Sequence, residues 1–113
     1  MINQLRIYEV PKSNKGPFLD RFRDHAARIM RERYGFRIQA MWTSETDEKL
    51  EFVYLLSWVD VDEMTRCWAA FMADEEWTAI KAETAAEHGD FVLGIREMVL
   101  NATEFSAPIG DVS

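Results

Sequence analysis

The segment from Glu51 to Val59 constrains the fold most, because it is apolar on both faces of a predicted strand. It is rich in β-branched and aromatic residues, which favour a pleated, buried strand. The two faces are formed by Phe52, Tyr54, Leu56 and Trp58, and by Glu51, Val53, Leu55, Ser57 and Val59. An antiparallel strand with one solvated face would alternate hydrophobic and polar residues. We therefore expect a sheet that is covered on both sides.

A helix is predicted directly after this strand. Asp60 and Glu63 have the spacing of a capping box, in which the first side chain covers free N–H groups and the later carboxylate reaches back. An apolar stripe follows at helical spacing and consists of Val61, Met64, Trp68 and Phe71. Asp74 can cap a second helical segment with acids in its first turn. That segment should end near His88, where Gly89 can adopt the left-handed conformation.

The rest of the chain carries similar signals. Alternation predicts a strand over Ile2–Val10, with Leu5 and Ile7 on one face and polar or aromatic residues on the other. Residues 17–34 have helical spacing and stop at Gly35. Residues 36–43 form a strand in which Trp42 shares a face with Phe36, Ile38 and Ala40, and it pairs with the central strand as a hairpin. A last strand is predicted over residues 91–103.

The order of these elements is strand, helix, strand, strand, helix, strand. With the helices on one face of an antiparallel sheet, this βαββαβ pattern predicts a ferredoxin-like α+β fold. Residues 1–106 then form a single domain, and residues 107–113 are expected to be an extended or disordered tail. The second sheet face needs a cover. Two such sheets packed in a symmetric homodimer supply it most simply.

Composition excludes several classes of function. The chain has 113 residues and a net charge of -7, with 20 acidic against 13 basic residues, which argues against nucleic-acid binding. It lacks a run of about 18 apolar residues, so no membrane span is expected. No leader pattern is visible, and the single cysteine, Cys67, lies in a predicted helix and suits a reducing compartment. We expect a cytoplasmic protein without a cofactor.

His25 is the most interesting polar residue of the first predicted helix. Its spacing from Phe18 and Ile29 places it on or beside the buried stripe. One interpretation is a histidine at the edge of the core, hydrogen-bonded to a backbone carbonyl or a strand residue. The other is a proton-transfer or ligand-binding residue at the floor of a pocket between helix and sheet. Spacing alone does not choose between them.

Further candidates would surround such a pocket. Tyr8 and Tyr54 are candidate hydrogen-bond donors for catalysis, and Arg6 and Arg96 are candidate anion stabilisers. The candidate aromatic walls are Trp42, Trp58 and Trp68. Glu83, Glu87 and His88 have some metal-ligand character, but no further convergent ligand accompanies them, so we predict no metal site.

The sequence resembles the NIPSNAP family of the dimeric α+β barrel superfamily over nearly its whole length. The matching residues are Leu5 to Tyr8, Phe22 to His25, Trp42-Thr43, Tyr54 to Trp58, Trp68, Phe71, Asp74 to Trp77 and Phe105-Ser106. The spacing from Trp58 through Trp68 to Trp77 is the specific part. The family usually has proline where this chain has Glu75, which leaves the capping role of Asp74 intact.

This resemblance implies a homodimer whose two sheets form a barrel, with a cavity between sheet and helices in each subunit. Related barrels include cofactor-free monooxygenases acting on aromatic polyketides, haem-degrading enzymes, isomerases and proteins without known catalysis, so the fold alone assigns no activity. Two hypotheses follow. The cavity binds a small apolar or aromatic molecule, with or without monooxygenase- or isomerase-like chemistry. Alternatively, the protein is a non-catalytic interaction protein whose aromatic residues only form the core and the dimer interface.

Overall fold

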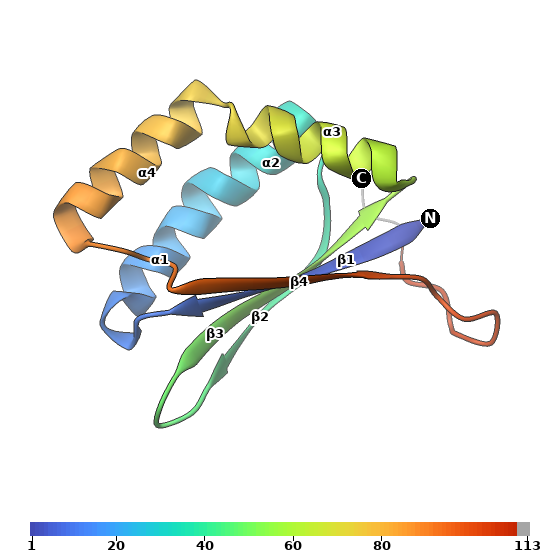
Figure 1. The fold of residues 1–113 in the computed structure, drawn as a ribbon, viewed down its shortest axis with the longest axis horizontal. Coiled ribbons are helices and arrows are strands. Elements are labelled where there is room, and N and C mark those ends of the chain that lie inside the picture. The colour runs from blue at the N-terminus through green and yellow to red at the C-terminus, as the bar shows by residue number, and fades with distance from the viewer. Residues whose placement is uncertain (111–113) are drawn as a thin grey trace.

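The structure is a computed structural model that describes residues 1–110, and residues 111–113 lie outside the described part. Figure 1 shows one sheet with all of its helices on one side. In chain order the elements are β1 (Ile2–Val10), a 3-10 turn (Lys12–Asn14), α1 (Lys15–Arg21), a π-helical turn (Phe22–Ala26), α2 (Ala27–Tyr34), β2 (Arg37–Glu45), β3 (Leu50–Trp58), α3 (Val61–Met72), α4 (Glu75–His88) and β4 (Gly94–Leu100).

The sheet has the strand order β2-β3-β1-β4, and every neighbouring pair is antiparallel. The two central strands, β3 and β1, are far apart in the sequence. A helical crossover joins β1 to β2 and another joins β3 to β4, whereas β2 and β3 form a hairpin. This arrangement is the ferredoxin-like α+β fold that the element order predicted. It places β1 beside both β3 and β4, so side chains from the N-terminal strand lie in the middle of the sheet.

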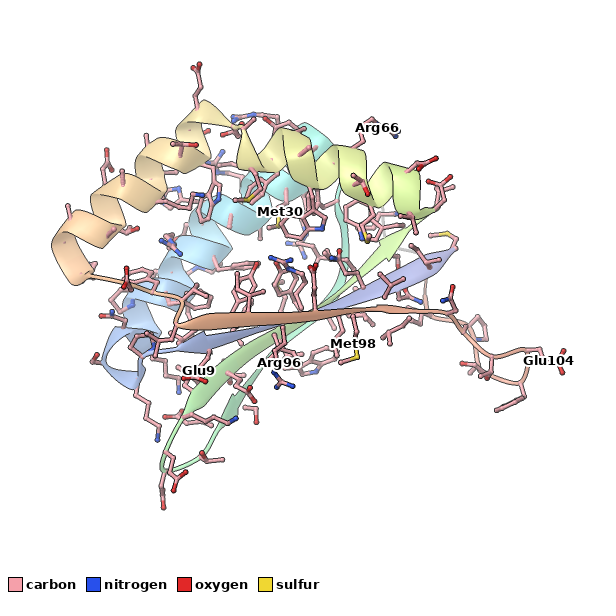
Figure 2. The ribbon with its side chains drawn as sticks, viewed as in Figure 1. Glu9, Met30, Arg66, Arg96, Met98 and Glu104 are labelled. Atoms are coloured by element: carbon pink, nitrogen blue, oxygen red, sulfur yellow. The ribbon has the colours of Figure 1, made fainter. Side chains whose placement is uncertain are left out.

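The core lies between the helices and one face of the sheet. In the β1–β3 register, Gln4, Arg6 and Tyr8 stand opposite Leu56, Tyr54 and Phe52, and directly opposed residues share a face. The apolar members of this layer pack against buried residues of the helices, which include Phe18, Phe22, Ala26, Ile29, Met30 and Phe71. In Figure 2, Met30 points from α2 into this layer. The polar members, Gln4 and Arg6, therefore lie inside the molecule.

Helix boundaries agree with the predicted capping signals. The Asp60 side chain accepts from the Glu63 N–H at 2.8 Å, and the Glu63 carboxylate reaches back to the Val59 N–H at 2.9 Å. The helical region breaks after Met72 and restarts under the Asp74 cap, as predicted. Gly35 ends α2 with a φ of 69°, in the left-handed region. These short-range signals are reliable because each cap needs only neighbouring backbone groups.

The first helical region differs from the prediction in two respects. It begins at Lys15, two residues before the expected start at Pro17, and it contains a π-helical turn over Phe22–Ala26. A π-helical turn has more residues per turn than an α-helix. The spacing of 3.6 residues that predicted which side chains face the sheet is therefore interrupted at this turn, which includes His25.

A β-bulge places Trp42 on the opposite sheet face from the one predicted. Ile38 pairs with Leu56, but Ala40 pairs with Leu55, so Gln39 is an extra residue in β2. Every later residue of the strand consequently changes face. Trp42 pairs with Val53 on the face that bears no helices, and it is 51% exposed. The prediction that Trp42 shares a face with Ile38 is wrong for this reason.

The sheet face opposite the helices has an apolar centre and bears no helix or strand from residues 1–110 (Figure 1). Leu5 and Ile7 of β1 and Val53 and Leu55 of β3 form its centre, as their paired registers require. Figure 2 shows Arg96 and Met98 of β4 on this side of the sheet. Strand β4 is shorter than the predicted span of residues 91–103. Phe91, which the prediction placed in this strand, precedes β4 and is buried in the core. Residues 101–110 form no helix or strand, and the rest of the predicted tail lies outside the described residues.

Candidate functional site

A cavity of about 310 Å³ lies between the sheet and the helices. Strands β1 and β4 supply one wall, and the helical elements supply the others. Seven of its eighteen lining residues are aromatic: Tyr8, Phe18, Phe22, Trp68, Phe71, Trp77 and Phe91. This size falls at the lower end of the range for small-molecule sites, which are usually apolar with a few polar groups. The cavity is therefore the candidate site.

Arg6 is the central polar group of the cavity wall. Strand alternation turns its side chain toward the helices, where it is only 14% exposed. Its guanidinium lies 4.3 Å from the ring centroid of Trp68, forms an ion pair with Glu97 of β4, and donates to the Tyr8 hydroxyl at 3.1 Å. The stacking and the ion pair hold the guanidinium in one orientation. Its Nε atom is buried and has no hydrogen-bond partner among residues 1–110.

Two tyrosines extend this polar group into the core. The hydroxyls of Tyr8 and Tyr54 are 2.5 Å apart, and Tyr54 is completely buried. Burial raises the pKa of the Tyr54 hydroxyl well above its ordinary value, so this residue stays neutral. The Tyr8 oxygen accepts from Arg6 and can also accept from Tyr54. In that arrangement the Tyr8 proton is free to be donated to a ligand oxygen.

Gln4 connects this group to two tryptophans. Its side-chain oxygen accepts from the indole N–H groups of Trp58 at 3.0 Å and Trp68 at 2.8 Å, and its amide donates to Glu97 at 3.1 Å. Gln4 and Glu97 were not among the residues singled out from the sequence. The sequence signal that could have identified Gln4 is its polar side chain at a helix-facing position of a strand, because a buried polar side chain needs hydrogen-bond partners. Its partners come from distant parts of the chain.

The structure brings together only some of the predicted site residues. Arg6, Tyr8 and Trp68 line the cavity, and Tyr54 lies directly behind Tyr8. Trp58 is fully buried and belongs to the core. Trp42 lies on the opposite sheet face because of the bulge at Gln39.

Arg96 also lies on the opposite sheet face. It pairs with Ile7 in the register, and its guanidinium donates to the Glu51 carboxylate at 3.0 Å. Neighbouring positions on a strand point to opposite faces. Arg96 is therefore separated from the cavity by the sheet, although the adjacent Ile95 lines it.

His25 lines a separate groove between the first helical region and α4, rather than the floor of the cavity. Asp20, Asp24, Glu83 and His88 also line this groove. The Nδ1 atom of His25 is buried and has no hydrogen-bond partner within residues 1–110. The π-helical turn explains the difference in position, because it changes the angular spacing on which the sequence interpretation depended.

Two further geometric findings concern residues 1–110. No group of three or more histidine, cysteine or acidic side chains in this part is arranged to hold a metal ion. His88 lies 3.7 Å from Glu87 at the exposed end of α4. No helix of the described chain is both long enough and apolar enough to cross a membrane.

Comparison with known proteins identifies the family. The family model described as NIPSNAP matches residues 3–107. The chain belongs to the NIPSNAP family. A search of curated protein sequences gave no match.

Solved NIPSNAP structures share the fold of this chain. An uncharacterised NIPSNAP-like domain protein from Burkholderia xenovorans has a TM-score of 0.80 and 19% identity, with 99% of this chain and 93% of that chain covered. A NIPSNAP family protein of unknown function from Agrobacterium tumefaciens has a TM-score of 0.79 and 18% identity, with 97% and 94% covered. An antibiotic biosynthesis monooxygenase is more distant, with a TM-score of 0.57, 13% identity, and 91% and 99% covered. At these identities the likeness concerns the fold.

Proposed function

We propose that this NIPSNAP protein is a homodimer that binds a small, flat, apolar or aromatic molecule in the cavity between its sheet and its helices. The observation that carries the proposal is the cavity of about 310 Å³, rich in aromatic side chains, with the polar group formed by Arg6 and Tyr8 in its wall. A ligand with flat rings would contact the aromatic walls, and its oxygen would bind the polar group.

Tyr8 is the proposed donor to the ligand oxygen. Tyr54 positions the Tyr8 hydroxyl from behind, and Arg6 stabilises negative charge on the bound oxygen. Trp68 holds the Arg6 guanidinium by stacking. Such a donor set favours an enolate or phenolate over its neutral form, which is a requirement of proton-transfer chemistry and of cofactor-free oxygenation. The fold shared with an antibiotic biosynthesis monooxygenase is compatible with this chemistry.

The homodimer is supported by the apolar sheet face opposite the helices. Its centre is formed by Leu5, Ile7, Val53 and Leu55. Trp42 and Met98 lie on the same face and are 51% and 44% exposed. A second copy of the same face would remove this surface from water.

The free, half-buried Cys67 is compatible with a reducing compartment, and a cytoplasmic location stays a prediction.

A second candidate is a non-catalytic interaction protein. The complete burial of Trp58 and the near-complete burial of Trp77 favour it, because both side chains act as core anchors. In this alternative the remaining aromatic residues also serve only packing and dimerisation. The two candidates differ in whether the cavity accepts a ligand.

A blocking substitution distinguishes the candidates. Ala85 of α4 lines the cavity and is exposed, whereas the neighbouring Ala86 is exposed and does not line it. We expect Ala85→Trp to weaken binding of 2-naphthol, a neutral probe, by about tenfold or more, because the indole occupies ligand space. Calorimetric titration measures the affinity.

Ala86→Trp is the matched control and should bind 2-naphthol as the unaltered protein does. If the unaltered protein binds neither 2-naphthol nor other flat aromatic probes, the ligand-binding proposal is wrong and the interaction protein is the better description. Equal loss of affinity in both variants would also contradict the assignment of the cavity.

A further inference from the structure

The cavity carries more positive charge than an acidic protein would lead one to expect. The chain has a net charge of -7, yet the charged residues that line the cavity are Arg6, Arg21, Lys81 and Asp90. Arg6 already has an ion-pair partner in Glu97. The remaining charges are therefore two cations against one carboxylate.

Arg21 is a half-buried cation without an acidic partner. Its guanidinium lies 4.5 Å from the ring centroid of Phe91 and 5.1 Å from that of Trp77, and its hydrogen bond goes to the neutral Thr84 hydroxyl at 2.8 Å. Within residues 1–110 it forms no ion pair. Burial lowers the pKa of Arg21, since a partly desolvated charge is disfavoured without a counterion.

Lys81 places a second cation next to the same indole. Its ammonium nitrogen lies 5.8 Å from the ring centroid of Trp77, and it too forms no ion pair with residues 1–110. Arg21 comes from α1 and Lys81 from α4, so the two elements converge on Trp77 at the cavity wall. A ligand anion here would contact two positive charges, the ammonium group of Lys81 and the forked guanidinium of Arg21.

We propose that the ligand of this cavity is a small aromatic carboxylate. Its rings contact the aromatic walls, and its carboxylate binds Arg21 and Lys81 beside Trp77. This inference rests on the proposed ligand-binding function and adds the charge of the ligand to it. A carboxylate supplies the counterion that Arg21 and Lys81 lack, whereas a neutral ligand would leave both cations partly desolvated and unpaired. The cavity volume suits an acid of one or two rings.

Two probes of matched shape test the proposal. Titration calorimetry at pH 7 and low ionic strength compares 2-naphthoate with its neutral amide, 2-naphthamide. We expect 2-naphthoate to bind about tenfold more tightly or better, because charge-assisted hydrogen bonds exceed neutral ones. Arg21→Met and Lys81→Met should each weaken 2-naphthoate binding by about tenfold and change 2-naphthamide binding by less than about twofold.

Arg23→Met is the control, because Arg23 lies in the same helical region, is 71% exposed and forms its ion pairs with Asp20 and Asp24. It should leave both affinities unchanged. Far-ultraviolet circular dichroism verifies that each variant folds. If Arg21→Met does not fold, the affinities of Lys81→Met decide the test, because Lys81 is only half-buried.

The outcomes separate this inference from the proposed function. If both probes bind equally well, the inference is overturned and the cavity remains a ligand site. The same conclusion follows if Arg21→Met and Lys81→Met both keep the preference for 2-naphthoate over 2-naphthamide. If neither probe binds to the unaltered protein, the inference is overturned, and if 2-naphthol does not bind either, the proposed function is overturned with it.

Discussion

At the residue scale, Gln4 joins parts of the chain that are far apart in sequence. One amide oxygen accepts from two indoles, and the amide nitrogen donates to the carboxylate that holds Arg6. The residue is almost fully buried, so water cannot replace these partners easily. Gln4 thus links the core at Trp58 to the cavity wall at Trp68.

Gln4→Met should destabilise the protein substantially while keeping a similar side-chain length. It removes the acceptor for two indole N–H groups, and each unpaired buried donor costs roughly 1–3 kcal/mol, so we expect the free energy of unfolding to fall by about 2–4 kcal/mol. Urea unfolding followed by tryptophan fluorescence measures the change.

The matched control for this substitution is Gln39→Met. Gln39 is half-buried at the β-bulge, and its amide donates to the Ser57 hydroxyl at 2.8 Å. We expect a loss of about 1 kcal/mol or less there. Comparable losses at both positions would show that the two indoles do not depend on Gln4.

At the scale of secondary-structure elements, Asp74 determines where α4 begins and fastens it to α2. One carboxylate oxygen accepts from the Trp77 N–H at 2.8 Å, and the other accepts from Tyr34 at 2.6 Å and Arg33 at 2.7 Å. These bonds, that of Tyr34 foremost, lower the pKa of Asp74 from 3.8 to about 2. The break between α3 and α4 is thus both a local cap and a tertiary contact.

Asp74→Asn should destabilise the protein in a pH-dependent manner. The folded pKa lies below the ordinary one, so the charged Asp74 stabilises the fold above about pH 4, and this contribution is lost as the pH falls toward 2. We expect the variant to be less stable by about 1–2 kcal/mol at pH 7. The difference from the unaltered protein should shrink between pH 4 and pH 2.

Urea unfolding at a series of pH values tests this expectation. Asp62→Asn, in the exposed first turn of α3, is the control and should change the free energy of unfolding by less than about 0.5 kcal/mol. A difference between Asp74→Asn and the unaltered protein that stays constant from pH 7 to pH 3 would rule out the charge as its source.

At the scale of the whole molecule, the two faces of the sheet have different roles. One face and the helices enclose the core and the cavity, and the other presents apolar side chains that no helix or strand of residues 1–110 covers (Figure 1). Leu55 lies on this second face in β3, opposite Leu5 of β1. The proposed dimer would bury both residues at its centre.

Leu55→Lys should convert the proposed dimer into a monomer, because a buried, unpaired ammonium group in an apolar interface is strongly disfavoured. Analytical ultracentrifugation at micromolar concentration measures the mass. Ala86→Lys adds the same charge to the exposed surface of α4 and should leave the dimer intact. A monomeric mass for the unaltered protein would refute the proposed assembly.

The element order and most boundaries could be predicted from the sequence because their signals are local. The alternation in β1 matches the observed strand, and Asp60, Asp74 and Gly35 mark helix ends where they were expected. Caps and turns depend on backbone groups a few residues away, so sequence alone contains their chemistry. The order of these elements predicted the fold class, and the family resemblance covers the same features.

Only the tertiary structure decided how the side chains combine. One extra residue at Gln39 moves Trp42 to the other face, and the π-helical turn accompanies the placement of His25 outside the cavity. The contacts of Gln4 and Arg6 with Glu97 join residues from opposite ends of the chain. No local pattern encodes such pairs, because strand register and packing bring their partners together only in the folded chain. Sequence thus determined the elements, and packing determined the site.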